Sequence, residues 1–150
     1  MRGNMVLTPD FIEFVKSLND NQVQYLIIGG YAVAFHGHPR YTKDLDVWIN
    51  PDSDNAEKVV QALADFGFES IGLSADDFSQ PDVTIQLGYP PNRIDLLTTA
   101  NGLQFDQCFP KKQILEIDNT EVAFIDLENL KENKRATGRH QDLADLEKLD

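Results

Sequence analysis

The chain has 150 residues, a length typical of one domain, and 41% of them are hydrophobic, which is enough for a packed core. Its formal net charge of −12 repels nucleic-acid phosphates and argues against a general nucleic-acid binder. No apolar run reaches the length of a membrane span, and the N-terminus lacks the apolar core of a signal peptide. The single cysteine, Cys108, excludes an internal disulfide, so we expect a cytoplasmic protein without membrane contact.

The first half of the chain predicts alternating helices and strands. A capping hydroxyl followed by proline marks the first helix, and an apolar stripe at helical spacing follows it. A capping aspartate or serine begins a second long helix, which a glycine ends. In chain order, the predicted elements are a helix from Thr8, a strand over 23–28, helical turns over 31–36, a strand over 44–49 and a helix from Asp52 or Ser53 to Phe66.

The second half predicts two hairpins followed by two helices. Apolar residues alternate with polar ones, or form short runs, on both sides of two turn sequences. The predicted elements are strands over 83–87 and 93–97, strands over 114–117 and 122–125, and helices from Leu127 to about Ala136 and over 140–149. This order indicates an α/β (α+β) fold: a single domain over residues 1–150 with a mixed central sheet flanked by helices.

Two aspartates lie one residue apart in the strand predicted over 44–49. Because side chains alternate across a strand, Asp44, Asp46 and Trp48 share one face, and the aliphatic residues between them form the core face. The two carboxylates then project together, roughly 6–7 Å apart along the strand. Such a pair needs a cation, and Mg²⁺ (or Mn²⁺), which prefers oxygen ligands and often shares them with phosphates, fits.

Gly29 and Gly30 end one buried strand and begin the next helical turns. Helix N-termini present free N–H groups, and glycine lets a phosphate approach the backbone. A phosphate-binding turn therefore lies one short loop away from a metal-binding pair, which is the layout of a site for a nucleoside triphosphate (NTP). Arg40 and Lys43 on that loop place positive charge beside the pair.

Asp95 is the candidate third metal ligand. It is an acid in the otherwise apolar strand over 93–97, on the opposite face from its aliphatic neighbours. If that strand lies beside the strand over 44–49, the three acids converge on a two-metal site, which can activate a hydroxyl and stabilise leaving pyrophosphate. The structural alternative is a strand-end acid paired with Arg93 or Arg40.

The string IIGGYAVAFHGHPRYTKDLDVWI, with a later strand aspartate, resembles the nucleotidyltransferase superfamily related to DNA polymerase β. More narrowly, it is similar to the minimal bacterial branch that includes the abortive-infection toxin-type nucleotidyltransferases. The resemblance implies the nucleotidyltransferase fold and transfer of a nucleoside monophosphate (NMP) from an NTP to a hydroxyl, with release of pyrophosphate. It implies Asp44, Asp46 and Asp95 as catalytic metal ligands, and Gly29 and Gly30 as contacts of the β- and γ-phosphates.

The C-terminal string KRATGRHQDLADLEKL is similar to the closing helices of the same branch. The resemblance implies that, as in this branch, a lysine of these helices contacts the triphosphate and a following aspartate supports the site. The matching positions are Lys134 and Asp142, with Arg139 between them. An ordinary solvated helix face is the alternative for this basic cluster.

The chain departs from the family pattern in two ways. Gly30 stands where many members have serine, so one hydroxyl contact to phosphate is missing. The short chain leaves little room for a separate acceptor-binding domain, which argues against a polymer such as tRNA. The acceptor stays open between a protein, a small molecule and tRNA.

Two other functions compete with transfer. One is a catalytically degenerate module that binds a nucleotide or a partner protein, as one half of a toxin–antitoxin or regulatory pair. The other is a metal-dependent phosphodiesterase that uses the same acids. A zinc site is not expected, because His36, His38 and His140 have no cysteine partners that would complete a zinc set.

Overall fold

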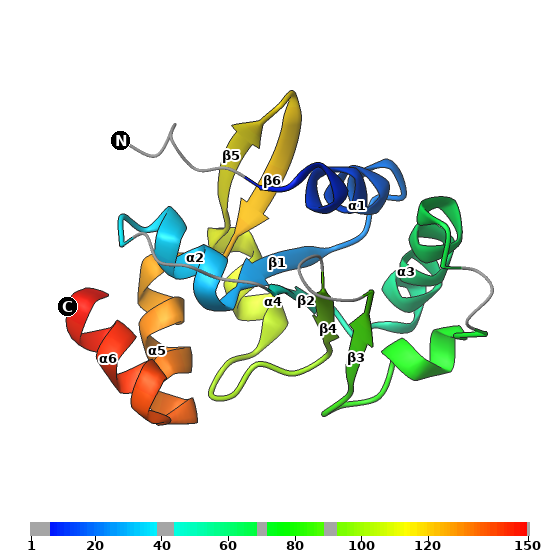
Figure 1. Cartoon of the computed structure of the whole chain (residues 1–150). Helices are drawn as coiled ribbons and strands as arrows, with labels where there is room; N and C mark the ends of the chain where they lie inside the picture. The colour runs from blue at the N-terminus through cyan, green and yellow to red at the C-terminus, as the bar shows by residue number, and fades with distance from the viewer. Residues whose placement is uncertain (1–6, 39–43, 69–71, 89–92, 150) are drawn as a thin grey trace.

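The computed structural model describes residues 7–38, 44–68, 72–88 and 93–149. Figure 1 shows a central sheet with helices packed around it. Within the described ranges, the helices are α1 (Pro9–Asp20), α2 (Gly29–Phe35), α3 (Ser53–Phe66), α4 (Phe105–Cys108), α5 (Leu127–Thr137) and α6 (His140–Leu149), with 3₁₀ turns η3 (Ala75–Phe78) and η4 (Phe109–Lys111). The strands are β1 (Tyr25–Ile28), β2 (Leu45–Ile49), β3 (Thr84–Leu87), β4 (Ile94–Leu97), β5 (Gln113–Ile117) and β6 (Thr120–Phe124). The predicted α+β class is confirmed.

One mixed sheet contains these strands in the order β3-β4-β2-β1-β6-β5. Strand β1 is antiparallel to β2 and parallel to β6, and β2 is parallel to β4. The antiparallel hairpins β3–β4 and β5–β6 form the two edges, as the sequence predicts. Asp118 and Asn119, with φ angles of 49° and 63°, make the tight turn between β5 and β6, which matches the left-handed turn that two-residue hairpins prefer.

The helix boundaries follow the local signals that predicted them. The Thr8 hydroxyl accepts a hydrogen bond from the Phe11 amide at 3.2 Å and begins α1. Asp52, rather than Ser53, caps α3 by accepting from the Asp54 amide at 3.2 Å. Gly67 ends α3 with a φ of 108°, a conformation that side chains other than glycine rarely adopt.

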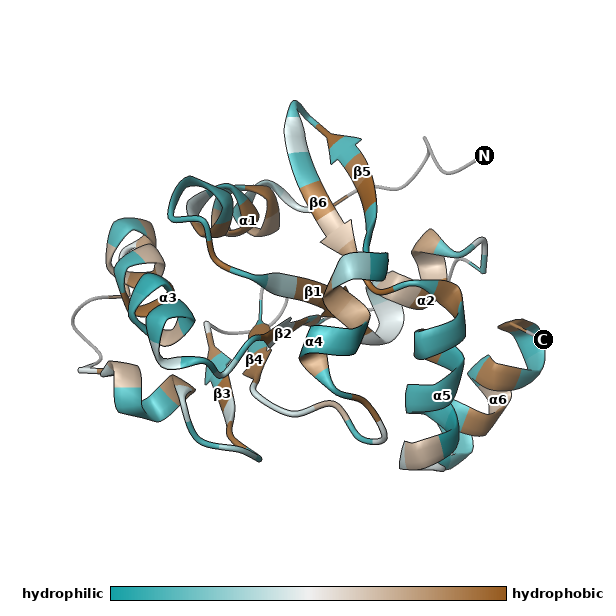
Figure 2. Ribbon diagram, turned by 180° about the vertical axis from the view of Figure 1, so that it is seen from behind, coloured by the Kyte–Doolittle hydropathy of each residue, from teal (hydrophilic) through white to brown (hydrophobic). Residues whose placement is uncertain are grey.

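The core lies on both faces of the central strands. Every residue of β1 is buried, and Figure 2 shows hydrophobic colour concentrated in β1, β2 and β4. Trp48, which shares a strand face with the acids, is also buried and packs edge-on against Phe105 of α4, with ring centroids 5.1 Å apart. The acid-bearing face of β2 is therefore covered along most of its length and opens only at the end where Asp44 and Asp46 lie.

Asn55, in the first turn of α3, fixes the other end of this strand pair. Its buried side chain accepts from the Gln24 amide at 2.7 Å and donates to the carbonyls of Gln24 and Asn50 at 3.1 and 2.8 Å. These hydrogen bonds join α3 to the residues that lead into β1 and out of β2. Because β1 and β2 supply the glycine turn and the aspartate pair, Asn55 helps to hold the site's framework.

We expect Asn55→Ala to lower the free energy of unfolding by about 2–4 kcal/mol, because three backbone groups of Gln24 and Asn50 lose the hydrogen bonds to this buried side chain. Urea denaturation followed by circular dichroism measures this change. Lys58→Ala, at an exposed position of the same helix, is the matched control and should change stability by no more than about 0.5 kcal/mol. Equal stabilities of the two variants would contradict the assigned role of Asn55.

Candidate active site

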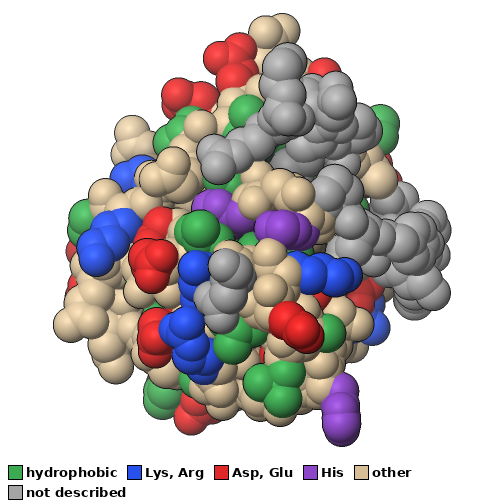
Figure 3. All heavy atoms as spheres, turned by 90° about the vertical axis from the view of Figure 1, so that its left-hand side faces the viewer, with side chains coloured by type: hydrophobic (Ala, Val, Ile, Leu, Met, Phe, Trp, Pro, Cys, Tyr) green, Lys and Arg blue, Asp and Glu red, His purple; other side chains and the backbone are tan. Residues whose placement is uncertain are grey.

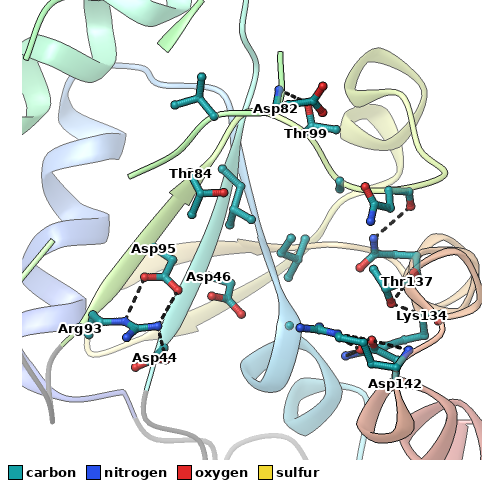
Figure 4. A pocket seen from close by; sticks show the side chains of 18 residues that line it. Asp44, Asp46, Asp82, Thr84, Arg93, Asp95, Thr99, Lys134, Thr137 and Asp142 are labelled. Carbon is teal, nitrogen blue, oxygen red and sulfur yellow. Dashed lines mark hydrogen bonds and ion pairs between the residues drawn. The ribbon is translucent and has the colours of Figure 1, made fainter. Parts of the chain in front are cut away.

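A pocket of about 630 Å³ lies between the sheet around β2 and β4 and the helices α5 and α6 (Figure 4). Its wall is rich in charged side chains from segments far apart in the sequence. These are Asp44, Asp46, Asp82, Arg93, Asp95, Lys134, Arg139 and Asp142. Such a lining suits a charged ligand rich in oxygen atoms better than an apolar one.

The three predicted acids come together at one end of this pocket. Asp46 and Asp95 are direct neighbours, because β2 and β4 are parallel and pair these two positions. Asp44 immediately precedes β2, and Figure 4 shows its side chain at the same end of the pocket. The sequence prediction that the strand of Asp95 lies beside the strand of Asp46 is thus confirmed, whereas the role of these acids as metal ligands stays a prediction.

Arg93 lies between two of the acids. Its guanidinium contacts both carboxylate oxygens of Asp95 at 3.2 Å, and its Nη2 lies 3.0 Å from Oδ2 of Asp44. This is the pairing that sequence analysis named as the structural alternative for Asp95. No group of three or more histidine, cysteine or acidic side chains is arranged to hold a metal ion within the ranges that the structure describes.

The surroundings of Asp46 shift its pKa strongly. Burial, followed by the negative charges of Asp95 and Asp44, raises the pKa of Asp46 from 3.8 to about 7, although Lys134 and Arg93 act in the opposite direction. Near neutral pH this carboxyl is therefore only partly ionised. An added cation beside Asp46 would favour its ionised form.

Gly29 brings the backbone close to this carboxylate. Ile28, at the end of β1, pairs with Asp46, and Gly29 follows with a φ of 70°. A Cβ atom at Gly29 would overlap the Asp46 carboxylate, so glycine is required by both space and conformation. Gly30 is buried within α2, whereas Gly29 is part of the pocket wall.

The opposite wall of the pocket is built around Lys134 of α5. Its ammonium lies 3.2 Å from carboxylates of both Asp142 and Asp145 on α6, and all three side chains are buried. Arg139 adds a 2.7 Å hydrogen bond from Nε to Asp142 and exposes 76% of its own side chain. The solvated-face alternative is therefore wrong for Lys134, because this lysine joins two helices from the inside.

Asp142 is the acceptor at the centre of this cluster. Although burial alone would raise its pKa, hydrogen bonds from Arg139, Thr137 and Lys134 hold the pKa of Asp142 well below its ordinary range. It therefore stays ionised and keeps two cations at the pocket wall. Lys134 and Arg139 balance the charges of Asp142 and Asp145, so the cluster as a whole is neutral.

Among the other residues singled out in the sequence, Arg40 and Lys43 lie outside the residues that the structure describes. Two further residues have structural roles. His36 shares a 2.8 Å hydrogen bond with the Ile125 carbonyl, which ties the end of α2 to the segment after β6. Cys108 is buried, and its pKa is raised to about 11, chiefly by burial, which leaves it a neutral thiol.

Sequence reasoning named Arg93 only as an alternative partner of Asp95, and it did not assign Asp82 or Asp145. Because Arg93 is two residues before Asp95, the two side chains share one strand face, which favours their pairing. Asp145 is three residues after Asp142, a spacing that puts both on one face of a helix. Asp82, which reaches the pocket from the loop before β3, has no sequence pattern that would have identified it.

The fold is that of the nucleotidyltransferases, as comparisons with known proteins show. Residues 10–149 match the model of the aminoglycoside-2''-adenylyltransferase family. The chain therefore belongs to this family. The narrower resemblance to the abortive-infection toxin-type branch stays a prediction.

Solved structures support the fold independently of sequence. A Thermotoga maritima protein assigned as a nucleotidyltransferase superposes with a TM-score of 0.60 at 13% identity, over 97% of this chain and 95% of the other. An antigenic nucleotidyltransferase-like protein from Paracoccidioides brasiliensis gives a TM-score of 0.54 at 18% identity, over 95% of this chain and 77% of the other. A search of curated protein sequences found no significant match. At these identities the structures establish the shared fold alone.

The helices found in the described ranges include none that is both long enough and apolar enough to span a membrane. The molecular side that carries α5 and α6 shows basic and acidic side chains interspersed (Figure 3).

We expect Asp46→Asn to make the metal-free protein more stable at high pH. Because the folded-state pKa of about 7 exceeds the ordinary value of 3.8, the wild-type fold loses stability as pH rises between these values. The variant escapes this loss, so its free energy of unfolding at pH 8 should exceed the wild-type value by about 2–4 kcal/mol, with the difference vanishing near pH 4. Chemical denaturation in EDTA at a series of pH values measures it.

The control is Asp106→Asn, which removes an exposed acid outside the pocket. A pH-independent difference between wild type and Asp46→Asn would show that Asp46 is not held at raised pKa. An equal gain in both variants would assign the effect to net charge alone.

Lys134→Met should destabilise the fold by about 3–5 kcal/mol, because it keeps the aliphatic stem but leaves two buried carboxylates without their shared cation. Lys131→Met is the matched control on the same helix, since the carboxylate that Lys131 approaches at 3.9 Å, that of Glu128, is exposed. Its cost should stay within about 0.5 kcal/mol. Thermal or urea unfolding of the two variants decides between them, and a silent Lys134→Met would contradict the buried cluster.

Proposed function

We propose that this protein transfers an NMP from an NTP to a hydroxyl acceptor and releases pyrophosphate, with Mg²⁺ or Mn²⁺ held by Asp44, Asp46 and Asp95. The observation that supports this most directly is the pairing of Asp46 with Asp95 on adjacent parallel strands, inside a pocket that Gly29 borders. Membership of an adenylyltransferase family supports the same class of reaction.

The donor set fits a divalent cation of the magnesium type. Three carboxylates supply only oxygen ligands, and the pocket wall carries more acidic than basic side chains. A bound metal would supply polarisation of phosphate and hydroxyl oxygens and neutralise developing charge. Asp44 and Asp46 would hold it from β2, and Asp95 would hold it from β4.

The chain's own residues then have distinct tasks. Asp95 would orient the acceptor hydroxyl and take up its proton, because this acid is held by strand β4 and its side chain lines the pocket. Gly29 and Gly30 would place backbone N–H groups near the β- and γ-phosphates. The absent side chain at Gly29 makes room for the Asp46 carboxylate beside the backbone of this turn.

Lys134 and Arg139 would form the positive side of the triphosphate site. Two N–H groups of Lys134 are directed to Asp142 and Asp145, so a third can face the pocket that this residue lines. Arg139 is more exposed and keeps part of its guanidinium outside the contact with Asp142. Asp142 supports both cations and need not touch the nucleotide itself.

A small molecule is our first candidate for the acceptor, ahead of a protein or tRNA. The family is named for an aminoglycoside-2''-adenylyltransferase, and a pocket of about 630 Å³ has the size of a small-ligand site. Away from the three acids, its wall carries Asp82, Thr84 and Thr99, which suit hydroxyl and amine groups. The chain's strong negative charge opposes a nucleic-acid acceptor.

The rival function is a degenerate nucleotide- or partner-binding module, including one half of a toxin–antitoxin pair. The pairing of Arg93 with Asp44 and Asp95 favours it, because a guanidinium can substitute permanently for a metal. The missing hydroxyl at Gly30 also favours it. The intact set of three acids opposes it.

Incubation with α-labelled NTPs, Mg²⁺ and a panel of hydroxyl-bearing small molecules should yield labelled product and pyrophosphate. Asp46→Asn should reduce the rate by at least about 100-fold, since it removes a metal ligand while retaining side-chain volume. Asp106→Asn is the matched control and should retain activity. Nucleotide binding without pyrophosphate release under all conditions would support the degenerate module instead.

A further inference from the structure

Arg93 is positioned by the sheet rather than by chance contact of a flexible side chain. Its carbonyl accepts a hydrogen bond from the Leu45 amide at 3.0 Å, so its backbone is tied to the start of β2. It directly precedes β4, which pairs with β2 in parallel. This arrangement holds the base of the Arg93 side chain within reach of acids from both strands (Figure 4).

The guanidinium makes the contacts that a divalent cation would make with two of these acids. It binds both oxygens of Asp95 at 3.2 Å and one oxygen of Asp44 at 3.0 Å. Arginine suits this task because its planar fork binds carboxylates through parallel hydrogen bonds and its charge persists at every physiological pH. These contacts leave out Asp46, whose pKa is raised by burial and by the negative charges of Asp95 and Asp44.

Arg93 also differs from Lys134, which likewise lowers the pKa of Asp46. Its side chain is 31% exposed, so water and open pocket space lie on one side of it. The Lys134 side chain is only 5% exposed and is held between two buried acids, so it cannot leave without disrupting α5 and α6. Of these two cations, Arg93 is the one that can move while the fold stays intact.

We propose that Arg93 is an exchangeable internal counter-ion: its guanidinium pairs Asp44 and Asp95 in the metal-free protein and leaves them when a divalent cation binds. This inference rests on the proposed metal-dependent function. Metal binding is then an exchange of one cation for another. Because Arg93 must be displaced, the protein binds a metal ion less tightly than the same three acids would without Arg93.

Titration of the full chain with Mn²⁺, followed by electron paramagnetic resonance of the free ion, tests this competition. Arg93→Met should bind Mn²⁺ about tenfold more tightly than wild type, because the metal no longer displaces a charge-assisted contact. Without metal, the same variant should melt about 2–4 °C lower, since the acids lose their counter-ion. Arg135→Met is the matched control, because Arg135 pairs with Glu132 on an exposed face and its loss changes the net charge equally.

Two further measurements keep the test decisive. Arg93→Lys retains the charge and should bind Mn²⁺ with an affinity between those of wild type and Arg93→Met. In ¹⁵N-labelled protein, the Arg93 Nε–H resonance should shift as Mg²⁺ is added, whereas the Arg139 Nε–H resonance, held by Asp142, should move little. A structural arginine would show no such selective shift.

The outcomes separate this inference from the proposed function. Mn²⁺ binding that Asp46→Asn weakens, with equal affinities in wild type and Arg93→Met, would overturn the exchange but leave the metal site standing. An equal rise in affinity in Arg93→Met and Arg135→Met would assign the effect to net charge and also overturn it. Absence of Mn²⁺ binding in wild type and every variant would overturn both.

Discussion

Clustered negative charge is the constraint on which this site depends. Three carboxylates lie at the ends of two adjacent strands and line one pocket. Carboxylates in such a place repel one another and lose hydration, so positive charge must be brought to them or protons must be retained. The structure shows both responses, since Arg93 pairs with Asp44 and Asp95 while the pKa of Asp46 is raised to about 7.

The same constraint explains how the C-terminal helices are attached. Lys134 brings a positive charge toward Asp46, but a buried lysine is tolerated only with partners of its own. Asp142 and Asp145 supply them from α6, and Arg139 restores neutrality at the surface. Buried Asn133 adds a 3.1 Å hydrogen bond to the Asn101 carbonyl and ties α5 to the loop after β4. The two helices thus form a wall whose position relative to the sheet is fixed.

These features give a nucleotidyltransferase fold in which an arginine of the chain pairs with two of the three acids. Family membership and fold establish the class, whereas metal dependence and the acceptor belong to our proposal. A site in which arginine already pairs two of three acids differs from an open cluster of metal ligands. A metal ion that binds Asp44 and Asp95 competes with Arg93 for these carboxylates, so the free energy of metal binding includes the loss of the Arg93 ion pairs.

The sequence by itself determined the strands, the longer helices and the candidate acids, but not α4 or the 3₁₀ turns η3 and η4. Capping residues, left-handed glycines and alternating apolar runs are local signals, so the boundaries of α1 and α3 and both hairpins could be predicted from neighbouring residues. The period of two in a strand placed Asp44 and Asp46 on one face. Only the tertiary structure decided that β4 lies parallel to β2, that Arg93 reaches both strands, and that Lys134 points inward to two acids of the next helix. Strand order and burial depend on contacts between distant segments, and no local pattern specifies which cation neutralises which acid.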